Sequence, residues 1–393
     1  MITVEEALAR CFALVTPLPA EPVGLRQAAG RVLAEAVSAR LTQPPFDASA
    51  MDGYALGRVG SAGDRFAVVG EAGAGHAFTG TLAPDQAARI FTGAPLPQGA
   101  ATIIIQEEVD VDGAAITLKV DPRPGDHTRR RGQDFAEGDT LSAPRRLRAN
   151  DLALLAAMNI PEVRVSRRPV VAIIATGDEL VMPGETPGPD QSVAANLFAL
   201  EAMARADGAE TRLLPIARDR EEDLRQVFDL AAGADLIVTI GGASVGDHDL
   251  VGKVAADMGL ERAFWKIAMR PGKPLMAGRL GASLMLGLPG NPVSAIVCGH
   301  LFLVPMLRAL QGLPQEGPRP ARARLAEDVG PAGNRVHYMR ARLAPGDDLP
   351  LISPFVSQDS ALLRILTEAD ALLVRPLGDG PRHAGEVVNY LPL

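Results

Sequence analysis

The chain has 393 residues, which is more than one hydrophobic core usually supports, so we expect several domains. Its composition, with 47% hydrophobic and 22% charged residues, is that of a globular protein. The 39 basic and 47 acidic residues give a formal net charge of −8, which argues against a general nucleic-acid-binding protein. An anionic ligand would therefore need a locally positive pocket.

Cysteine and histidine usage excludes two further classes of site. The cysteines, Cys11 and Cys298, lie far apart in apolar helical patterns, which excludes a disulfide framework. The 6 histidines lack the H-x-H and H-x-x-x-H spacings typical of metal sites. The sequence also lacks a signal-peptide pattern and a run of about 18 apolar residues, so we expect a cytoplasmic protein without a membrane span.

The first residues predict a helix that begins at a capping box, with Thr3 as the cap and Glu6 three residues later. Residues 25–37 are typical either of a second short helix or of a helix–strand pair. Helical patterning returns at residues 150–160, where LALLAAMNI could pack beside the N-terminal helices. Between these parts, from about residue 48 to 143, short alternating runs and Gly/Pro-rich turns predict an inserted β domain.

From about residue 169 to 312, continuous apolar strands alternate with amphipathic helices. PVVAIIAT, TRLLPIA, LIVTI and SLMLGLP predict strands, and NPVSAIVCGHLFLVPMLRAL predicts a long helix. This alternation is typical of a parallel sheet that helices cover on both faces. After the PQEGPRP run at residues 314–320 short strands return, which predicts a second small β domain.

Three loops pair glycine with polar residues where a predicted strand meets a helix: ATGDEL (175–180), TIGGASVGDHD (239–249) and GLPGNPVS (287–294). Glycine lets backbone N–H groups approach a phosphate, and ligands bind beyond the carboxyl ends of parallel strands. One such loop is weak support for a site, because glycine and aspartate are common in turns. Three on one sheet edge favour a ligand site, although a Walker A motif and a dinucleotide fingerprint are both missing.

Positive charge comes from WKIAMRPGKP (265–274), where Lys266, Arg270 and Lys273 surround a Pro-Gly turn. Solvated turn charges are the common explanation for such residues. The turn follows the same predicted sheet, so its cations could instead hold a second anion beside the glycine-rich loops.

These motifs resemble the molybdopterin molybdenumtransferase family, which catalyses the last step of molybdenum cofactor synthesis and includes the C-terminal part of gephyrin. The resemblance rests on seven ordered motifs: PPFDASAMDGYAL (44–56), RIFTGAPLPQGAATIIIQEE (89–108), RRRGQDF (129–135), ATGDEL, GGASVGDHD, RPGKP and GLPGNPVS.

The resemblance implies a multidomain α/β plus β fold. Its central α/β domain (169–314) has a parallel sheet similar to the molybdopterin adenylyltransferase fold. An elongated helical region (1–46 and 136–168), an inserted β domain (47–135) and a C-terminal β domain (315–393) complete the chain. The family also implies a homodimer, with contact to the molybdopterin adenylyltransferase and to molybdenum-enzyme chaperones as further expectations, and neither nucleic acid nor membrane as a partner.

By resemblance, the substrates are adenylylated molybdopterin and molybdate, AMP is released, and Mg²⁺ is the cofactor. The pterin's own dithiolene sulfurs bind molybdenum, so the protein need not supply Cys or His ligands. An aspartate beside a phosphate loop then becomes attractive, because Mg²⁺ prefers one or two carboxylates plus phosphate oxygens. Asp249 is the expected ligand of Mg²⁺, and Asp247 competes for that role.

The family motifs also imply the remaining site residues. The catalytic set is Asp52, Thr92, Asp134, Glu179, Asp219 and Asp249. The substrate-binding set is Gly241, Gly242, Ser244, Arg270, Lys273, Pro289, Gly290, Asn291, Pro292, Ser294, Arg340 and Ser360.

Simpler structural roles stay open for some of these residues. Asp52 precedes Gly53 and also suits a turn, and Asp219 also suits the N-cap of the helix that follows it. Arg270 stands where many relatives have lysine, so the charge is kept while the geometry can differ.

The alternatives are a molybdopterin adenylyltransferase, or a hydrolase of pyrophosphate bonds of the competence-damage type. Both families lack the SAMDGY and IFTGAPLPQGA motifs that this chain carries at residues 49–54 and 90–100. A scaffold or binding role, as gephyrin has, is a third possibility from a different class.

Overall fold

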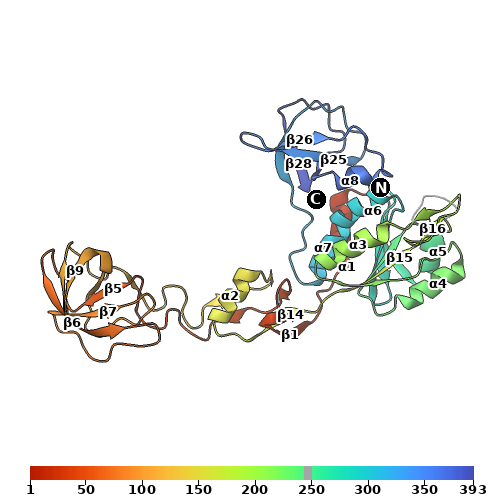
Figure 1. Cartoon of the computed structure of the whole chain (residues 1–393). Coiled ribbons are helices and arrows are strands. Elements are labelled where there is room, and N and C mark those ends of the chain that lie inside the picture. The colour runs from red at the N-terminus through yellow and green to blue at the C-terminus, as the bar shows by residue number, and fades with distance from the viewer. Residues whose placement is uncertain (243–249) are drawn as a thin grey trace. The chain divides into compact units, whose positions relative to one another are not determined.

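The computed structural model describes residues 1–242 and 250–393, and its contacts divide the chain into two compact units (Figure 1). The α/β unit contains Met1–Glu21, Gly30–Ala34 and Val165–Leu393. The β unit contains Pro22–Ala29 and Glu35–Arg164. Each unit has its own hydrophobic core and is described by itself.

The β unit is built around a sheet with strand order β8-β5-β7-β6-β10-β9. These strands are β5 (Gly53–Leu56), β6 (Arg65–Ala72), β7 (Gln86–Ile90), β8 (Thr102–Ile105), β9 (Val109–Asp112) and β10 (Ala115–Leu118). Apolar side chains cover both faces of the sheet, which explains why β5 is buried throughout. Gly53 begins β5 where a Cβ atom would overlap the Ile104 carbonyl oxygen, so only glycine fits between its two neighbouring strands.

The rest of this unit consists of short elements. They are the 3-10 turns Leu25–Gln27 and Gln106–Glu108, β3 (Val37–Ser38), β4 (Ala48–Ser49), β11 (Thr128–Arg129), β12 (Thr140–Leu141), β13 (Arg145–Arg146) and α2 (Ala149–Ala157). Strands β1 (Ala20–Gly24) and β14 (Glu162–Ser166) lie where the chain passes from one unit to the other. Residues 25–37 therefore form a turn followed by strands, which is the second of the two predicted alternatives.

The α/β unit contains a sheet with strand order β18-β15-β19-β23-β22-β20. Its strands are β15 (Val170–Ala175), β18 (Glu210–Leu213), β19 (Leu236–Ile240), β20 (Leu260–Trp265), β22 (Met276–Leu280) and β23 (Ser283–Leu288). The strands from β18 to β23 run parallel, whereas β22 and β20 are antiparallel to their neighbours. The predicted parallel sheet is confirmed for the part that carries the glycine-rich loops, and a hairpin adds the antiparallel edge.

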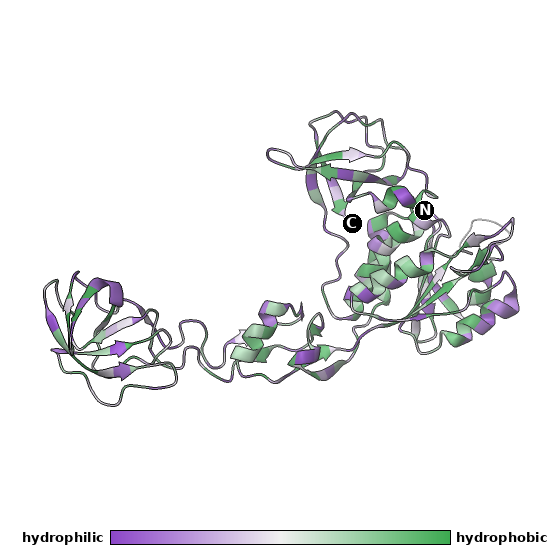
Figure 2. Ribbon diagram, in the orientation of Figure 1, coloured by the Kyte–Doolittle hydropathy of each residue, from purple (hydrophilic) through white to green (hydrophobic). Residues whose placement is uncertain are grey.

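Helices cover both faces of this sheet, as its continuous apolar strands require. The helices are α1 (Val4–Leu14), α3 (Asn196–Ala206), α4 (Glu221–Leu230), α5 (Leu250–Asp257), α6 (Pro292–Cys298) and α7 (Val304–Leu310), with a π-helical segment, Gly299–Leu303, between the last two. Alternate residues of β15 face opposite cores: Ile173 packs with α1, α3, α6 and α7, whereas Ile174 packs with α4 and α5. Figure 2 shows apolar residues concentrated along these strands and inner helix faces.

Two helices differ from expectation. Helix α1 has the predicted cap, since the Glu6 amide donates to Thr3 Oγ1 at 3.1 Å, but it packs against β20, β22 and α7 and so belongs to the α/β core. The long helical stretch Pro292–Leu310 is apolar enough to pass as a membrane span, with mean hydropathy 1.8. However, 83% of it is buried inside the unit, which is the environment of a core helix.

The C-terminal part forms a barrel with strand order β21-β25-β26-β24-β28-β27, which an additional pairing of β25 with β27 closes. Its elements are β21 (Met269–Arg270), β24 (Ala321–Leu325), β25 (Val336–Ala344), β26 (Leu351–Pro354), β27 (Ala371–Arg375), β28 (Val387–Pro392) and α8 (Leu363–Thr367). Outside the barrel, the α/β unit also contains the short strands β2 (Val32–Leu33), β16 (Leu180–Val181) and β17 (Ser192–Val193). The strand β21 comes from the RPGKP segment, so the predicted cation loop is attached to the barrel. The predicted multidomain α/β plus β fold is thereby confirmed.

A partly buried ion pair holds the start of the α/β sheet. Arg167 donates two hydrogen bonds to the Asp235 carboxylate, at 2.7 and 3.0 Å, and the Val170 amide donates a third at 2.7 Å. We expect Asp235→Ala to lower the free energy of unfolding by about 2 kcal/mol, because charged hydrogen bonds are lost and a cation is left unpaired. The measurement is urea unfolding followed by the fluorescence of Trp265, the chain's 1 tryptophan.

The matched control is Asp257→Ala, which removes the exposed ion pair with Arg225 at 3.3 Å. That change should cost less than about 0.5 kcal/mol. Equal losses in the two variants would contradict a structural role for the Asp235 pair.

Candidate functional site

A pocket of about 680 Å³ lies at the carboxyl ends of β15, β19 and β23. All three predicted loops contribute to it, which is the placement expected for an open parallel sheet. Among the predicted site residues, those that line the pocket are Glu179, Asp219, Gly241, Gly242, Pro289, Gly290, Asn291 and Pro292. Ser244, Asp247 and Asp249 lie outside the described residues.

The floor of the pocket is a turn that only glycine can form. Gly241 and Gly242 have φ angles of +95° and +63°. A Cβ atom on Gly241 would lie 2.7 Å from the Thr176 carbonyl oxygen, and one on Gly242 would overlap Val251 Cγ2. Both residues therefore have to be glycine, and they line the pocket with backbone alone, which lets a ligand approach the main chain closely.

One end of the pocket is acidic. Arg218 donates to the carbonyl oxygens of Asp178 and Leu180, at 2.8 and 3.1 Å, and so fixes the backbone that carries Glu179. The Asp219 amide donates to Asp178 Oδ1 at 3.2 Å. Partial burial raises the pKa of Asp219, and repulsion from Asp178 and Glu179 raises it further. This concentration of negative charge favours a cation at this end of the pocket.

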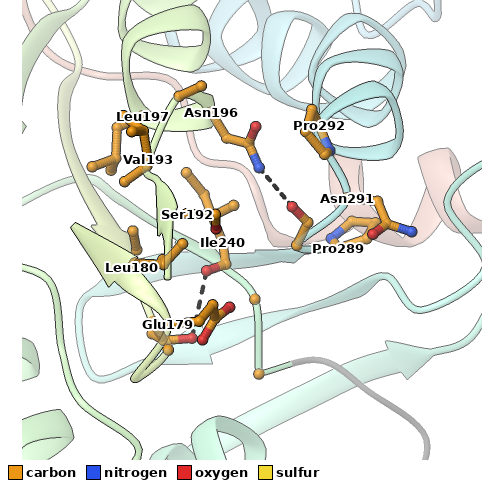
Figure 3. A pocket seen from close by; sticks show the side chains of 18 of the residues that line it. Glu179, Leu180, Ser192, Val193, Asn196, Leu197, Ile240, Pro289, Asn291 and Pro292 are labelled. Carbon is orange, nitrogen blue, oxygen red and sulfur yellow. Dashed lines mark hydrogen bonds between the residues drawn. The ribbon is translucent and has the colours of Figure 1, made fainter. Parts of the chain in front are cut away.

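The opposite wall is the loop from Pro289 to Pro292, which begins helix α6. Figure 3 shows the side chain of Asn196 pointing to this loop, where its Nδ2 atom donates to the Gly290 carbonyl oxygen at 2.7 Å. Asn291 points the other way and donates to Ser360 Oγ at 3.0 Å. Ser294 is buried one turn into α6.

The predicted cation loop lies at the rim of the same pocket, because Pro274 and Ala361 complete the lining. Arg270 is exposed, and Lys273 is half-buried. Gly272, with φ of +105°, lies so close to Cys298 that a Cβ atom would come within 2.5 Å of the sulfur. The loop therefore rests directly on helix α6.

The barrel side of the cation loop is strongly positive. His337 pairs with Arg270 across β21 and β25 and with Arg375 across β25 and β27. Burial lowers the pKa of His337 to about 4, with further lowering by nearby arginines, Arg270 first. This imidazole stays neutral at physiological pH, because burial disfavours its charged form and the nearby arginines disfavour it further.

Arg340 is fully buried, with 1% of its surface exposed. Its guanidinium donates to the carbonyl oxygens of Ser357 and Leu362, at 3.3 and 3.2 Å. These bonds hold the loop that carries Ser360, so two predicted site residues belong to one structural feature.

The remaining predicted residues belong to the β unit. Asp52 accepts hydrogen bonds from the backbone N–H and the hydroxyl of Thr92, both at 2.8 Å, which lower the pKa of Asp52. Asp134 is exposed, and its amide donates to the Gln43 carbonyl oxygen at 3.1 Å. The structure thus brings Asp52 and Thr92 together, as the family motifs implied.

Some residues of the site carried no usable sequence signal. Asn196 and Arg218 were not predicted, and Asp178 was overlooked beside Glu179. In the β unit, Asp47 accepts from the Arg130 side chain and the Arg131 amide, both at 2.8 Å. Each of these roles depends on contacts between residues far apart in the sequence.

Comparison with known proteins matches three parts of the chain to known families. The MoeA N-terminal region (domains I and II) matches residues 2–159, the probable molybdopterin binding domain matches residues 172–309, and the MoeA C-terminal region (domain IV) matches residues 322–393. A molybdopterin molybdenumtransferase from Nostoc sp. is 37% identical over 95% of this chain and 88% of its own length. The chain belongs to the molybdopterin molybdenumtransferase family.

Other relatives cover the whole chain. The molybdopterin molybdenumtransferase of Haemophilus influenzae is 33% identical over 100% of this chain and 98% of its own length. The molybdopterin biosynthesis MoeA protein of Pyrococcus horikoshii has a solved structure with a TM-score of 0.82 and 30% identity, covering 100% of this chain and 99% of that one. The predicted activity, a transferase that acts on molybdopterin, is thereby confirmed over the adenylyltransferase and hydrolase alternatives.

The two acids with shifted pKa values predict opposite effects on stability. Ionised Asp219 destabilises the fold because its pKa is raised above the unfolded value of 3.8, so Asp219→Asn should raise the melting temperature near pH 7.5. This gain should shrink as the pH falls through the raised pKa of wild-type Asp219, where the carboxylate takes up its proton.

Asp52→Asn is the matched comparison, measured by calorimetry over the same pH range. Ionised Asp52 stabilises the fold because its pKa is lowered below 3.8, so removing its charge should lower the melting temperature. That deficit should persist down to about pH 4. The same pH dependence in both variants would contradict these assignments.

Proposed function

We propose that the pocket of the α/β unit binds adenylylated molybdopterin, and that the loop from Arg270 to Lys273, together with Ser360, binds molybdate beside it. The observation that carries the proposal is that the glycine-rich loops and the neighbours of the cation loop and of Ser360 line the same pocket. Glycine-rich loops form its floor, while Pro274 and Ala361, the chain neighbours of Lys273 and Ser360, form its rim. Two anionic substrates would then meet within a single cavity.

The phosphate groups would bind at the turn of Gly241 and Gly242. Both glycines line the pocket, and backbone N–H groups in such turns bind anions without carrying a full charge. The Gly241 N–H already donates to the Leu288 carbonyl oxygen at 3.1 Å, so the N–H of Gly242 would serve as the donor. Ser244, which follows in the same loop, would add a hydroxyl group. Adenylyl transfer needs little covalent chemistry from the protein, so positioning of the phosphate is the main contribution of this loop.

Molybdate would bind through Arg270, Lys273, Ser294 and Ser360, and the buried Arg340 would hold the loop of Ser360 through its bonds to the Ser357 and Leu362 carbonyl oxygens. An arginine can hold an oxyanion with two parallel hydrogen bonds, and a lysine adds a point charge. The surroundings of Arg270 support this assignment, because several arginines lie near His337 and add to the lowering of its pKa that burial causes. The same field would attract a dianion such as molybdate.

The chemistry does not require protein thiolates or imidazoles as metal ligands. Among residues 1–242 and 250–393, no group of three His, Cys, Asp or Glu side chains could hold a metal ion. Burial also raises the pKa of Cys11 to about 12 and raises that of Cys298, so both thiols stay protonated. The dithiolene sulfurs of the substrate would supply the ligands for molybdenum.

Mg²⁺ is the cofactor that we propose for the acidic end of the pocket, held by Asp249 or by Asp247. The fit rests on the neighbouring carboxylates of Asp178, Glu179 and Asp219, whose repulsion raises the pKa of Asp219. When bound, Mg²⁺ would neutralise charge on the phosphate oxygens. Glu179 would orient the pterin or carry a proton.

In the proposed reaction, the oxygen atom of a water molecule attacks the adenylyl phosphorus and loses a proton. If a molybdate oxygen attacks instead, its Mo–O bond must also break, and that oxygen leaves with AMP. The bond to the bridging oxygen then breaks, AMP leaves, and the pterin keeps its own phosphate. As the dithiolene sulfurs bind molybdenum, each oxo group that they displace leaves as water with two protons. The acidic residues near the phosphate are suited to handle these protons.

The assembly is also part of the proposal. In a homodimer, Asp52, Thr92 and Asp134 of one subunit would line the cleft opposite the α/β domain of the other. We further propose that the enzyme acts in the cytoplasm, and that it receives its substrate from the molybdopterin adenylyltransferase and passes its product to molybdenum-enzyme chaperones.

The central expectation is AMP release that depends on molybdate. Purified protein with adenylylated molybdopterin, Mg²⁺ and molybdate should release AMP and yield cofactor that activates an apo-enzyme. Glu179→Gln should reduce the rate about 100-fold, because proton handling contributes that much in typical enzymes. The exposed Glu222→Gln is the control and should keep the wild-type rate. AMP release that ignores molybdate would point to hydrolysis and refute the proposal.

Lys273→Ala tests the molybdate assignment separately. Losing a charged contact should raise the KM for molybdate about tenfold, while the affinity for AMP stays unchanged. Lys253→Ala is the matched control, since Lys253 pairs with Glu221 on the exposed faces of α4 and α5. If Lys273→Ala weakened AMP binding alone, Lys273 would belong to the phosphate site instead.

A further inference from the structure

A chain of hydrogen bonds crosses one wall of the pocket. It begins at Asn196, the first residue of α3, whose Nδ2 atom donates to the Gly290 carbonyl oxygen at 2.7 Å (Figure 3). The next residue, Asn291, donates to Ser360 Oγ at 3.0 Å. The Val293 amide donates to the Ser360 carbonyl oxygen at 3.1 Å. The barrel loop and the wall of the pocket are thus joined at two points.

The loop between these bonds has little freedom of its own. Pro289 and Pro292 flank it, and each fixes one backbone angle. At its centre, a Cβ atom on Gly290 would lie 3.6 Å from the Gly241 Cα, so the loop packs against the glycine turn. A displacement of Gly290 would therefore also displace the turn of Gly241 and Gly242 and, through Asn291, the side chain of Ser360.

Asn196 also lies inside the pocket. Its side chain lines the cavity together with Ser192 and Val193, and it is the bond to Gly290 that ties this wall to the loop on the other side. A ligand that fills the pocket must contact this wall. A ligand that contacts Asn196 could therefore change the position of the loop from Pro289 to Pro292 through the bond to Gly290.

We propose that Asn196 is a positioning residue that couples the two substrate sites: through Gly290 and Asn291 it holds Ser360 in the geometry that binds the oxyanion. This inference rests on the proposed function, because it assigns the two ends of the chain to adenylylated molybdopterin and to molybdate. Binding of either ligand would fix the loop from Pro289 to Pro292 in one conformation. The second ligand would then lose less conformational entropy when it binds, so it would bind more tightly. Such coupling is reciprocal: each ligand changes the affinity for the other by the same factor, typically about 5- to 150-fold.

The test compares Asn196→Ala with the wild type in three measurements. The variant should raise the KM for molybdate about fivefold or more, although Asn196 itself lies on the pterin side of the pocket. In the wild type, saturating AMP should tighten molybdate binding, measured by calorimetry, and molybdate should tighten AMP binding by the same factor. Asn196→Ala should reduce both factors to about 1, while its melting temperature stays near that of the wild type.

A double-mutant cycle with Asn291→Ala tests whether the bonds act as one chain. If they do, adding Asn291→Ala to Asn196→Ala should change the KM for molybdate less than about twofold further. Asn196→Ser, which suits a helix start but is too short to reach Gly290, should behave like Asn196→Ala and guards against a folding defect. Asn389→Ala, on the exposed side of β28, is the control and should change neither constant.

The possible outcomes distinguish failure of the coupling from failure of the proposed function. If the wild type shows no molybdate-dependent AMP release, the proposed function fails. If the wild type is active but Asn196→Ala leaves the KM for molybdate within about twofold, only the coupling is refuted. Additive effects in the double-mutant cycle would also refute it.

Discussion

The site depends on the close approach of two backbones at the end of the central sheet. Gly241 and Gly242 turn away from β19 against the backbone of Thr176, at positive φ angles and in a space that admits no side chain. This contact is possible because β15 and β19 are adjacent parallel strands, in register from Val171 and Leu236 to Ala175 and Ile240. The buried strands therefore do more than form a core, since they place two ligand loops at the same height.

Charge is distributed around this turn in an ordered way. Near Asp178 and Glu179, burial and the neighbouring carboxylates together raise the pKa of Asp219. On the barrel side, burial and nearby arginines, Arg270 first, together lower the pKa of His337. A chain with net charge −8 can therefore still offer a positive site to an oxyanion. The acidic end suits a cation and the phosphates that it accompanies, and the basic end suits a second anion.

Much of the fold could be predicted from the sequence because the signals are local. The cap at Thr3, the apolar strands and the glycine-rich loops each depend on residues within about ten positions of one another. The antiparallel edge of the sheet was missed because β22 contains the polar residue Arg279 and follows a proline-rich turn. The attachment of β21 to the barrel pairs residues more than sixty positions apart, and short-range patterns do not encode such pairings.

The candidate site divides in the same way. Gly241, Glu179 and Asn291 stand in motifs and could be named from the sequence, whereas Asn196 gains its role only through a hydrogen bond to a residue 94 positions away. The burial of Arg340 likewise depends on the loop at residues 357–362, which the strand pattern of the barrel does not reveal. Family motifs thus identify residues that line the pocket more readily than residues that hold the lining in place.

The most direct test of the central claim is a crystal structure of the protein with AMP and molybdate bound together. The account predicts one cavity with both ligands: the AMP phosphate against the glycine turn at the backbone N–H of Gly242, and molybdate within hydrogen-bonding distance of Lys273 and Ser360. Molybdate bound elsewhere on the protein, or AMP bound away from the glycine turn, would contradict it.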